Sequence, residues 1–296
     1  SVDTTSDNGY IVSGYENGDG VTMKLDNSGN EVWKKTVGGI YEDETKEARV
    51  LKNGDIIAVG KFASPTININ NTTITRIGKN NGYIICYDAN GNYKWHKAIT
   101  GTGDIVPTSI TETSHGIAVA INYLETINID GNAITNEGYQ DAVIVAFSEE
   151  GTYQWNKKIG GSNDESISKV VTDSNDNIVA VGCFASNLTI DTETINCSTE
   201  DYSNSIVLKF ASTTGDYISS KVLDQSDRDD KIITATPIDD GAILLGGWYS
   251  YDKKYENGFV AKLNDQNEIE WSRAFGDESF YENYGITQLS NKTIVA

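Results

Sequence analysis

Carboxylate side chains are the groups in this sequence best suited to chemistry, because several recur at one point of a repeated pattern. Clustered carboxylate oxygens are ligands that Ca²⁺ prefers. We therefore predict a calcium site if these residues gather near one axis. The alternative is that each carboxylate only accepts backbone N–H groups in its own turn. The predicted metal ligands are Asp43, Asp104, Asp164, Asp229 and Asp277.

Catalytic patterns are not recognisable. Paired carboxylates can hydrolyse glycosidic bonds, but 43 acidic residues make chance pairs inevitable. Neither His96 nor His115 has a neighbouring Ser, Cys or carboxylate in a nucleophile arrangement, and no zinc motif is present. We assign no catalytic residue. Cys86 lies in an apolar run, whereas Cys183 and Cys197 flank a loop that a disulfide could close, so a bridge and free thiols both remain open.

Aromatic side chains gather towards the end of the chain and form a second candidate site. Flat rings beside Asp and Asn suit sugar stacking or a protein-binding hot spot. The alternative is packing between repeats, above all for the tryptophan. The predicted ligand-binding residues are Trp248, Tyr249, Tyr251, Tyr255, Tyr281 and Tyr284.

One repeated stretch organises the whole chain, and it reads DAVIVAFSEEGTYQWNKKIGG at 141–161. Its apolar run is typical of a strand buried on both faces, and its glycine marks a hairpin turn before a more polar strand. Variants begin at 20, 82, 205 and 258, and their tryptophan positions are 62, 60, 64 and 52 residues apart. Such internal similarity is typical of propellers and solenoids. The repeated position holds Trp33, Trp95, Trp155, Ser219 and Trp271.

Two earlier strands precede each hairpin, which makes four antiparallel strands in every unit. This pattern predicts an all-β β-propeller of four-stranded antiparallel blades, with about five complete blades and part of a sixth. We assign a packing role between blades to Trp33, Trp95, Trp155 and Trp271. We treat 1–296 as a single propeller domain or a fragment of one, with units at approximately 1–38, 39–99, 100–159, 160–223, 224–275 and 276–296.

The connection from the second to the third strand is long in three units, at 63–81, 124–140 and 185–204. Its TININ, TINID and LTID segments suggest small additional hairpins. Insertions confined to one kind of loop lie on one face, which in repeat proteins is often the binding face.

Charge and targeting signals narrow the class of partner. A formal net charge of −20 disfavours nucleic acid and anionic membrane surfaces, both of which attract basic proteins. No signal peptide, transmembrane segment or lipidation motif is recognisable, which predicts no membrane insertion. The abrupt start and end of the chain indicate part of a larger polypeptide.

The repeats resemble bacterial extracellular propeller repeats of the SBBP (seven-bladed β-propeller) family. The segments that carry this resemblance are GGSNDESISKVVTDSNDNIVAVGCF at 160–184 and GFVAKLNDQNEIEW at 258–271. The resemblance implies a propeller fold and an extracellular or cell-surface location, and it says little about activity. The hairpin is also similar to the tryptophan-docking motifs of quinoprotein propellers, but the ligand set for calcium-bound pyrroloquinoline quinone is not recognisable.

Together these patterns favour a non-catalytic extracellular or cell-surface binding module that presents its insertion loops to a glycan or protein partner. Two alternatives stay open. One is a glycoside-processing enzyme with axial carboxylates, with Ca²⁺ as the expected cofactor at the acidic set. The other is a rigid structural spacer in a large surface protein.

Overall fold

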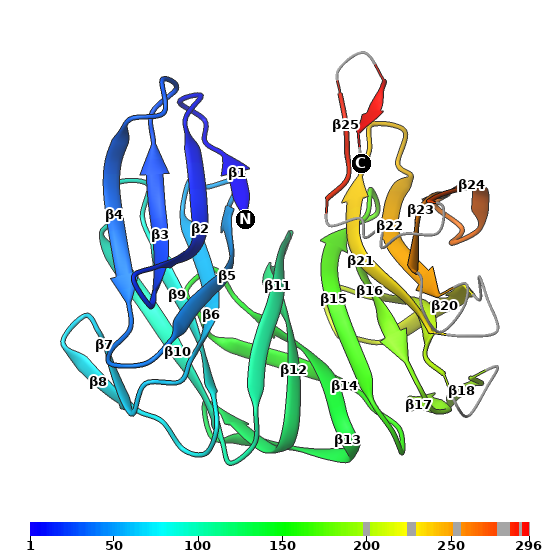
Figure 1. Cartoon of the computed structure of the whole chain (residues 1–296), viewed down its shortest axis with the longest axis horizontal. Helices are drawn as coiled ribbons and strands as arrows, with labels where there is room; N and C mark the ends of the chain where they lie inside the picture. The colour runs from blue at the N-terminus through cyan, green and yellow to red at the C-terminus, as the bar shows by residue number, and fades with distance from the viewer. Residues whose placement is uncertain (198–201, 224–228, 251–255, 277–284, 290–291, 296) are drawn as a thin grey trace. The chain divides into compact units, whose positions relative to one another are not determined.

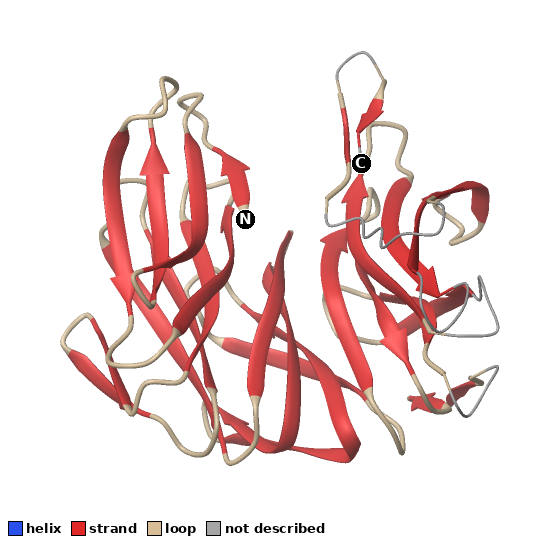
Figure 2. Ribbon diagram, viewed as in Figure 1, coloured by secondary structure: helices blue, strands red, loops and turns tan. Residues whose placement is uncertain are grey.

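The computed structural model describes residues 1–197, 202–223, 229–250, 256–276, 285–289 and 292–295. These residues form strands and turns and contain no helix (Figure 2). The strands pair in antiparallel four-stranded sheets, so the prediction of an all-β fold built from β-propeller blades is confirmed. Two compact units make up the chain, and each is described by itself: Ser1–Ile110, Ile121–Asn136 and Ala146–Gln154 form the first, and Thr111–Ala120, Glu137–Val145 and Trp155–Ala296 form the second.

The first unit opens with a complete blade in the order β1-β2-β3-β4 (Figure 1). The next repeat has the order β5-β6-β9-β10, and the β7–β8 hairpin interrupts it between its second and third strands. The bounds are β1 Val2–Thr4, β2 Tyr10–Glu16, β3 Asp19–Leu25, β4 Glu31–Val37, β5 Asp43–Val50, β6 Ile56–Phe62, β7 Thr66–Ile69, β8 Thr72–Thr75, β9 Asn81–Tyr87 and β10 Tyr93–Gly101.

The third repeat consists of β11 to β14, and each of these strands has residues in both units. The sheet path is β14-β13-β12-β10-β9-β6-β5, with β11 paired to β12. The bounds are β11 Ile105–Thr113, β12 Gly116–Ile129, β13 Asn132–Phe147 and β14 Tyr153–Ile159.

The second unit contains two more four-stranded blades, β15-β16-β19-β20 and β21-β22-β23-β24, and the short hairpins β17–β18 and β25–β26. The bounds are β15 Glu165–Thr172, β16 Ile178–Phe184, β17 Leu188–Ile190, β18 Glu193–Ile195, β19 Asn204–Phe210, β20 Tyr217–Leu223, β21 Asp230–Pro237, β22 Ile243–Ser250, β23 Glu256–Leu263, β24 Ile269–Phe275, β25 Thr287–Gln288 and β26 Ile294–Val295.

In two of the blades the third strand is buried along its whole length, as its apolar run predicts. Every residue of β9 and of β19 is buried. A strand of this kind needs an apolar layer on both faces. The core cluster around Ile85 supplies one such layer, because it includes Ile11 and Val37 from the preceding blade. Successive blades therefore share a core.

The long insertions form the predicted hairpins, and these pack on the outer strand of the preceding blade. Alternate residues Leu188 and Ile190 of β17 are buried in the same cluster as Ile159 of β14. The turn of that hairpin adds an ion pair between Asp191 and Lys157. In the first unit, β12 extends far enough to pair with β10, with Ile129 opposite Ile99. The inserted hairpins thus connect neighbouring blades through apolar packing, an ion pair and strand pairing.

The repeated tryptophans contact the next blade at the opposite end of the strands. The indole Nε1 of Trp95 donates to the Glu149 carbonyl at 2.9 Å, and Trp33 and Trp155 donate to the carbonyls of Ala89 and Ser212 at 3.3 and 3.1 Å. These three carbonyls belong to equivalent turns between third and fourth strands. Trp271 instead packs against the cluster of Leu244, Val260 and Ile286.

Candidate functional site

A cavity lies in the second unit, at the end of the strands that carries the insertions. It has a volume of about 700 Å³ and opens between the loop before β15, the start of the blade's insertion and the strand that returns from the previous insertion. We call it the Asn163 groove. Its lining residues are Glu137, Gly160, Gly161, Ser162, Asn163, Ala185, Ser186, Asn187, Thr189 and Cys197.

A second cavity of about 380 Å³ adjoins the Asn163 groove and shares Asn163 and Ala185 with it. Tyr139 and Tyr202 also line this second cavity. The Tyr139 side chain is 72% exposed, and its backbone N–H donates to the Asn163 carbonyl at 3.2 Å. The second cavity therefore has an exposed aromatic residue whose backbone is hydrogen-bonded to Asn163.

Buried hydrogen bonds hold the floor of the groove. The Glu165 carboxylate accepts from the Gly161 N–H at 2.6 Å and from the Ser186 hydroxyl at 2.8 Å, and both Glu165 and Ser186 are buried. The Asn163 Nδ2 donates to the Ala185 carbonyl at 3.0 Å. These bonds connect the loop before β15 with the segment that follows β16. Because the two bonds of Glu165 are shielded from water, they fix the shape of the groove in advance of any ligand.

Two buried carboxyl groups beneath the groove have raised pKa values. Burial raises the pKa of Glu165 and that of Asp141 above their ordinary values, and the proximity of Asp141 raises the pKa of Glu165 further. Asp141 Oδ2 accepts from the Glu137 N–H at 2.9 Å, while its Oδ1 is buried with no hydrogen-bond partner among the described residues. Protonation of Asp141 would remove the cost of burying that charge.

The predicted metal ligands occupy two different structural positions. Asp43 is buried and accepts from the backbone of Gly39, Ala63 and Ser64 and from the Ser64 hydroxyl, so it caps the loops of its own blade. Glu165 holds the same position two blades later, with Gly161 and Ser186 as its donors.

The other described members of the set connect to the preceding blade. Asp104 Oδ1 accepts from Asn80 Nδ2 at 2.7 Å. Asp164 accepts from the Gln140 N–H at 3.1 Å, and Asp229 accepts from the Ser203 N–H at 2.8 Å and from its hydroxyl at 3.0 Å. Asp277 lies outside the described residues. Among the residues that are described, no group of three or more His, Cys, Asp or Glu side chains could hold a metal ion.

Only two of the predicted aromatic ligands lie within the described part of the chain. Trp248 and Tyr249 are both half-buried in β22, and Tyr249 packs against the apolar cluster that contains Ile232 and Phe259. Tyr251, Tyr255, Tyr281 and Tyr284 lie outside the described residues, so a shared aromatic surface stays a prediction.

The cysteines are unbridged. Cys86, Cys183 and Cys197 are all free thiols, which answers the question left open for the last two. The Cys183 Sγ lies 3.3 Å from the Ser166 hydroxyl, whereas the Cys197 Sγ lies 3.1 Å from Asn204 Oδ1. Burial raises the pKa of the Cys86 thiol to about 12 and also raises that of Cys183, which suppresses the reactive thiolate.

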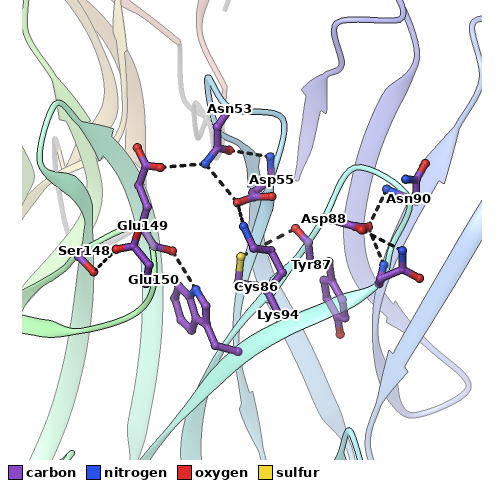
Figure 3. Close-up of polar contacts among 12 residues, drawn as sticks. Asn53, Asp55, Cys86, Tyr87, Asp88, Asn90, Lys94, Ser148, Glu149 and Glu150 are labelled. Carbon is purple, nitrogen blue, oxygen red and sulfur yellow. Dashed lines mark hydrogen bonds and ion pairs between the residues drawn. The ribbon is translucent and has the colours of Figure 1, made fainter.

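A polar network lies at the tryptophan-bearing end of the first unit (Figure 3). Asn53 Nδ2 donates to Asp55 at 3.1 Å and to the Glu149 carboxylate at 3.0 Å, and Lys94 forms an ion pair with Asp55. The Glu149 carbonyl also receives the Trp95 indole. The contacts of Asn53 and Trp95 with Glu149 join the second repeat to the third, which gives the network a structural role.

Histidine forms a further polar group in the second unit. The Ser114 hydroxyl lies 2.9 Å from His115 Nδ1 and 2.6 Å from Asp176 Oδ2, and Ser212 also donates to Asp176. Serine and aspartate both approach the same ring nitrogen, whereas a catalytic triad places them on opposite nitrogens. His96, in turn, contacts the hydroxyl of Tyr93 at 2.7 Å through Nδ1.

The groove residues were missed in the sequence because small polar residues in loops carry no motif. One signal could have found them. The repeat-equivalent segments GGIYED and GGSNDE, at 38–43 and 160–165, both precede the first strand of a blade that carries a long insertion.

Comparisons with known proteins add a general likeness to solved propeller structures. No protein-family model matches the chain, and no curated protein matches its sequence. A protein of unknown function from Bacteroides caccae is 9% identical, with 90% of this chain and 93% of that chain covered and a TM-score of 0.39. BamB from Moraxella catarrhalis is 15% identical, with 98% and 79% covered and a TM-score of 0.39.

A third solved structure is an enzyme, the quinohemoprotein alcohol dehydrogenase from Comamonas testosteroni. It is 12% identical, with 90% of this chain and 52% of that chain covered and a TM-score of 0.40. Likenesses at this level carry no functional inference for this chain. Within the described residues, no helix is long and apolar enough to cross a membrane.

Proposed function

We propose that this chain is a non-catalytic binding module that holds a glycan or protein partner at the insertion-bearing end of its blades. The single observation that supports this function most is the Asn163 groove, a cavity of about 700 Å³ with a floor fixed by buried hydrogen bonds. Ligand sites are commonly preformed cavities of about 300–1,000 Å³ with a few well-placed polar groups.

A binding role fits this site better than catalysis does, because the carboxylates of the groove and of the adjoining cavity already have structural partners. Glu165 accepts hydrogen bonds from Gly161 and Ser186, and Asp164 accepts one from Gln140. Glu137 forms an ion pair with Lys158. A general acid or base needs an oxygen within reach of the substrate proton. The glycoside-processing alternative therefore has less support than the binding module.

The proposal also covers where the module lies relative to the cell and which repeat family its blades belong to. We assign the module to the outside of the cell or the cell surface and its repeats to the SBBP-like bacterial propellers. The support is the repeated four-stranded unit with its tryptophan position. The strong negative charge disfavours nucleic acids and anionic membranes as partners.

A glycan array combined with a library of surface-protein fragments tests the function. We expect saturable binding that EDTA leaves unchanged, because the described residues assemble no metal-ligand group. Loss of binding in EDTA would instead favour calcium at the predicted acidic set. A chain that binds neither glycans nor proteins in either condition is better described as a rigid spacer, and the proposal would then fail.

A further inference from the structure

We infer that the Asn163 groove and the cavity that adjoins it take a neutral oligosaccharide, with one sugar ring stacked on Tyr139 of the adjoining cavity. This inference rests on the proposed binding function and names its ligand class. It depends on three features: the chemistry of the groove lining, the charge and pairing of the carboxylates in the groove and the adjoining cavity, and the exposed Tyr139 ring in the adjoining cavity.

The groups that line the groove can both donate and accept hydrogen bonds. Ser162, Asn187 and Thr189 are exposed side chains on its wall, and Asn163 adds a half-buried amide. Hydroxyl and amide groups match the hydroxyls of a sugar, each of which is also both donor and acceptor. Glycine and alanine occupy much of the remaining surface, so few bulky apolar side chains are available to a lipid-like ligand.

Charge selects against acidic ligands. Glu137 lines the groove, and Asp164, Glu165 and Asp229 line the adjoining cavity. An anion placed there would be repelled by these carboxylates and by the net charge of −20. A sulfated, sialylated or uronic-acid glycan is therefore disfavoured.

These carboxylates are poorly available to the cationic side chains of a basic peptide, because they are already paired or buried. Glu137 is paired with Lys158, and Asp229 accepts two hydrogen bonds from Ser203. Glu165 is buried at the floor. A cationic side chain would have to compete with these partners, and the polar uncharged wall remains the more accessible surface. The lining thus favours a neutral ligand over a charged one of either sign.

Tyr139 supplies the stacking surface. Its side chain is 72% exposed and lines the cavity that adjoins the groove, and its backbone N–H donates to the Asn163 carbonyl. Aromatic rings stack on the C–H faces of sugars and gain apolar contact there.

The test is isothermal titration of the whole chain with neutral cello-, manno- and chito-oligosaccharides and with oligogalacturonate as the acidic match. We expect a neutral series to bind, Tyr139→Ala to weaken it about tenfold or more, and Tyr139→Phe to keep it within about threefold. Thr189→Val, which keeps the shape and removes one hydroxyl, should weaken binding about threefold to tenfold.

Tyr41→Ala is the matched control, because Tyr41 is 56% exposed in the first unit and does not line the groove. It should leave affinity unchanged, and thermal melts should show that all variants fold. If oligogalacturonate or a lysine-rich peptide binds, and Tyr139→Ala abolishes that binding, the inferred ligand class is wrong but the proposed binding function stands. If neutral oligosaccharides bind equally well to the Tyr139 and Thr189 variants, the groove is not the binding site. If no probe binds at all, the proposed binding function also fails.

Discussion

Two contacts between blades, one made by a tryptophan and one by a lysine, end at the same point of the repeat. In the first unit the Trp95 indole donates to the Glu149 carbonyl at 2.9 Å. In the second unit the equivalent position is Ser219, and Lys209 from the adjacent strand donates to the Asp265 carbonyl at 2.9 Å instead. Glu149 and Asp265 are the second residues of equivalent turns. A cation on a flexible chain thus replaces a rigid ring.

The turn that receives the contact changes with it. A Cβ atom on Gly91, Gly151 or Gly215 would lie 2.6–2.8 Å from the ring of the docked tryptophan. The turn reached by Lys209 has Asn267 at this position, with a positive φ of 69°. The tryptophan-docked turns therefore require glycine for two reasons, the positive φ angle and the close approach of the ring. The turn that Lys209 reaches has only the first requirement, which asparagine can meet.

The two contacts also differ in how they are stabilised. The indole gains from apolar packing and one hydrogen bond. Lys209 is almost fully buried and needs a counter-charge, which Asp173 supplies at 3.0 Å. A buried ion pair is sensitive to the loss of either partner, because the remaining charge is left without compensation. The comparison shows that one repeat position can be filled by two different physical interactions.

Removal of a docked indole should have the largest effect on stability. We expect Trp155→Ala to lower the free energy of unfolding by about 3–5 kcal/mol, because it empties the space between two blades and leaves the Ser212 carbonyl without its donor. Urea denaturation followed by circular dichroism measures this. Ser219→Ala is the matched control at the equivalent position and should cost less than about 0.5 kcal/mol. A loss below about 1 kcal/mol for Trp155→Ala would show that the ring does not support the blades.

Removal of the buried cation should have the next largest effect. We expect Lys209→Met to cost about 3 kcal/mol, because it leaves Asp173 buried without its counter-charge. Lys262→Met is the control, since its partners Asp240 and Glu270 are substantially exposed, and it should cost about 1 kcal/mol or less. Equal losses in the two variants, again from urea denaturation, would contradict a special role for Lys209.

A methyl group added to the turn separates the ring contact from the backbone angle. Gly151 has φ of +79° and lies against Trp95, whereas Gly29 has φ of +82° with nothing within 4 Å of its Cβ position. We expect Gly29→Ala to cost about 1 kcal/mol from the angle alone and Gly151→Ala about 2–3 kcal/mol. Thermal melts of the two variants measure the difference. If the two costs agree, the ring does not restrict this turn.

Protonation should produce the smallest effect, and it concerns the capping position shared by Asp43 and Glu165. Burial raises the folded-state pKa of Glu165, so the native state binds its proton more tightly than the unfolded state does. Stability from this group is therefore lost as pH rises from the ordinary glutamate value through the raised one. Glu165→Gln, whose amide can still contact Ser186, should remove that part of the pH dependence. Denaturation midpoints of both proteins from about pH 4 to about pH 8 test this, and parallel profiles would refute it.

The sequence alone determined the strand order within a blade and the positions of the hairpin turns. Alternating and unbroken apolar runs specify which strands are half-buried and which are covered on both faces, and Asp26 and Asp88 then close their turns through nearby backbone N–H groups. Both signals are local, because they depend on neighbours within a few residues.

The tertiary structure alone decided which groups meet across blades. The acidic set looks uniform in the sequence, yet Asp43 caps its own blade while Asp164 holds Gln140 of the previous one. Lys209 reaches the turn at Asp265, 56 residues away, and the Asn163 groove is built from loops of two repeats. Such contacts depend on the distance and angle between whole sheets, which residue types and spacing along one chain do not specify.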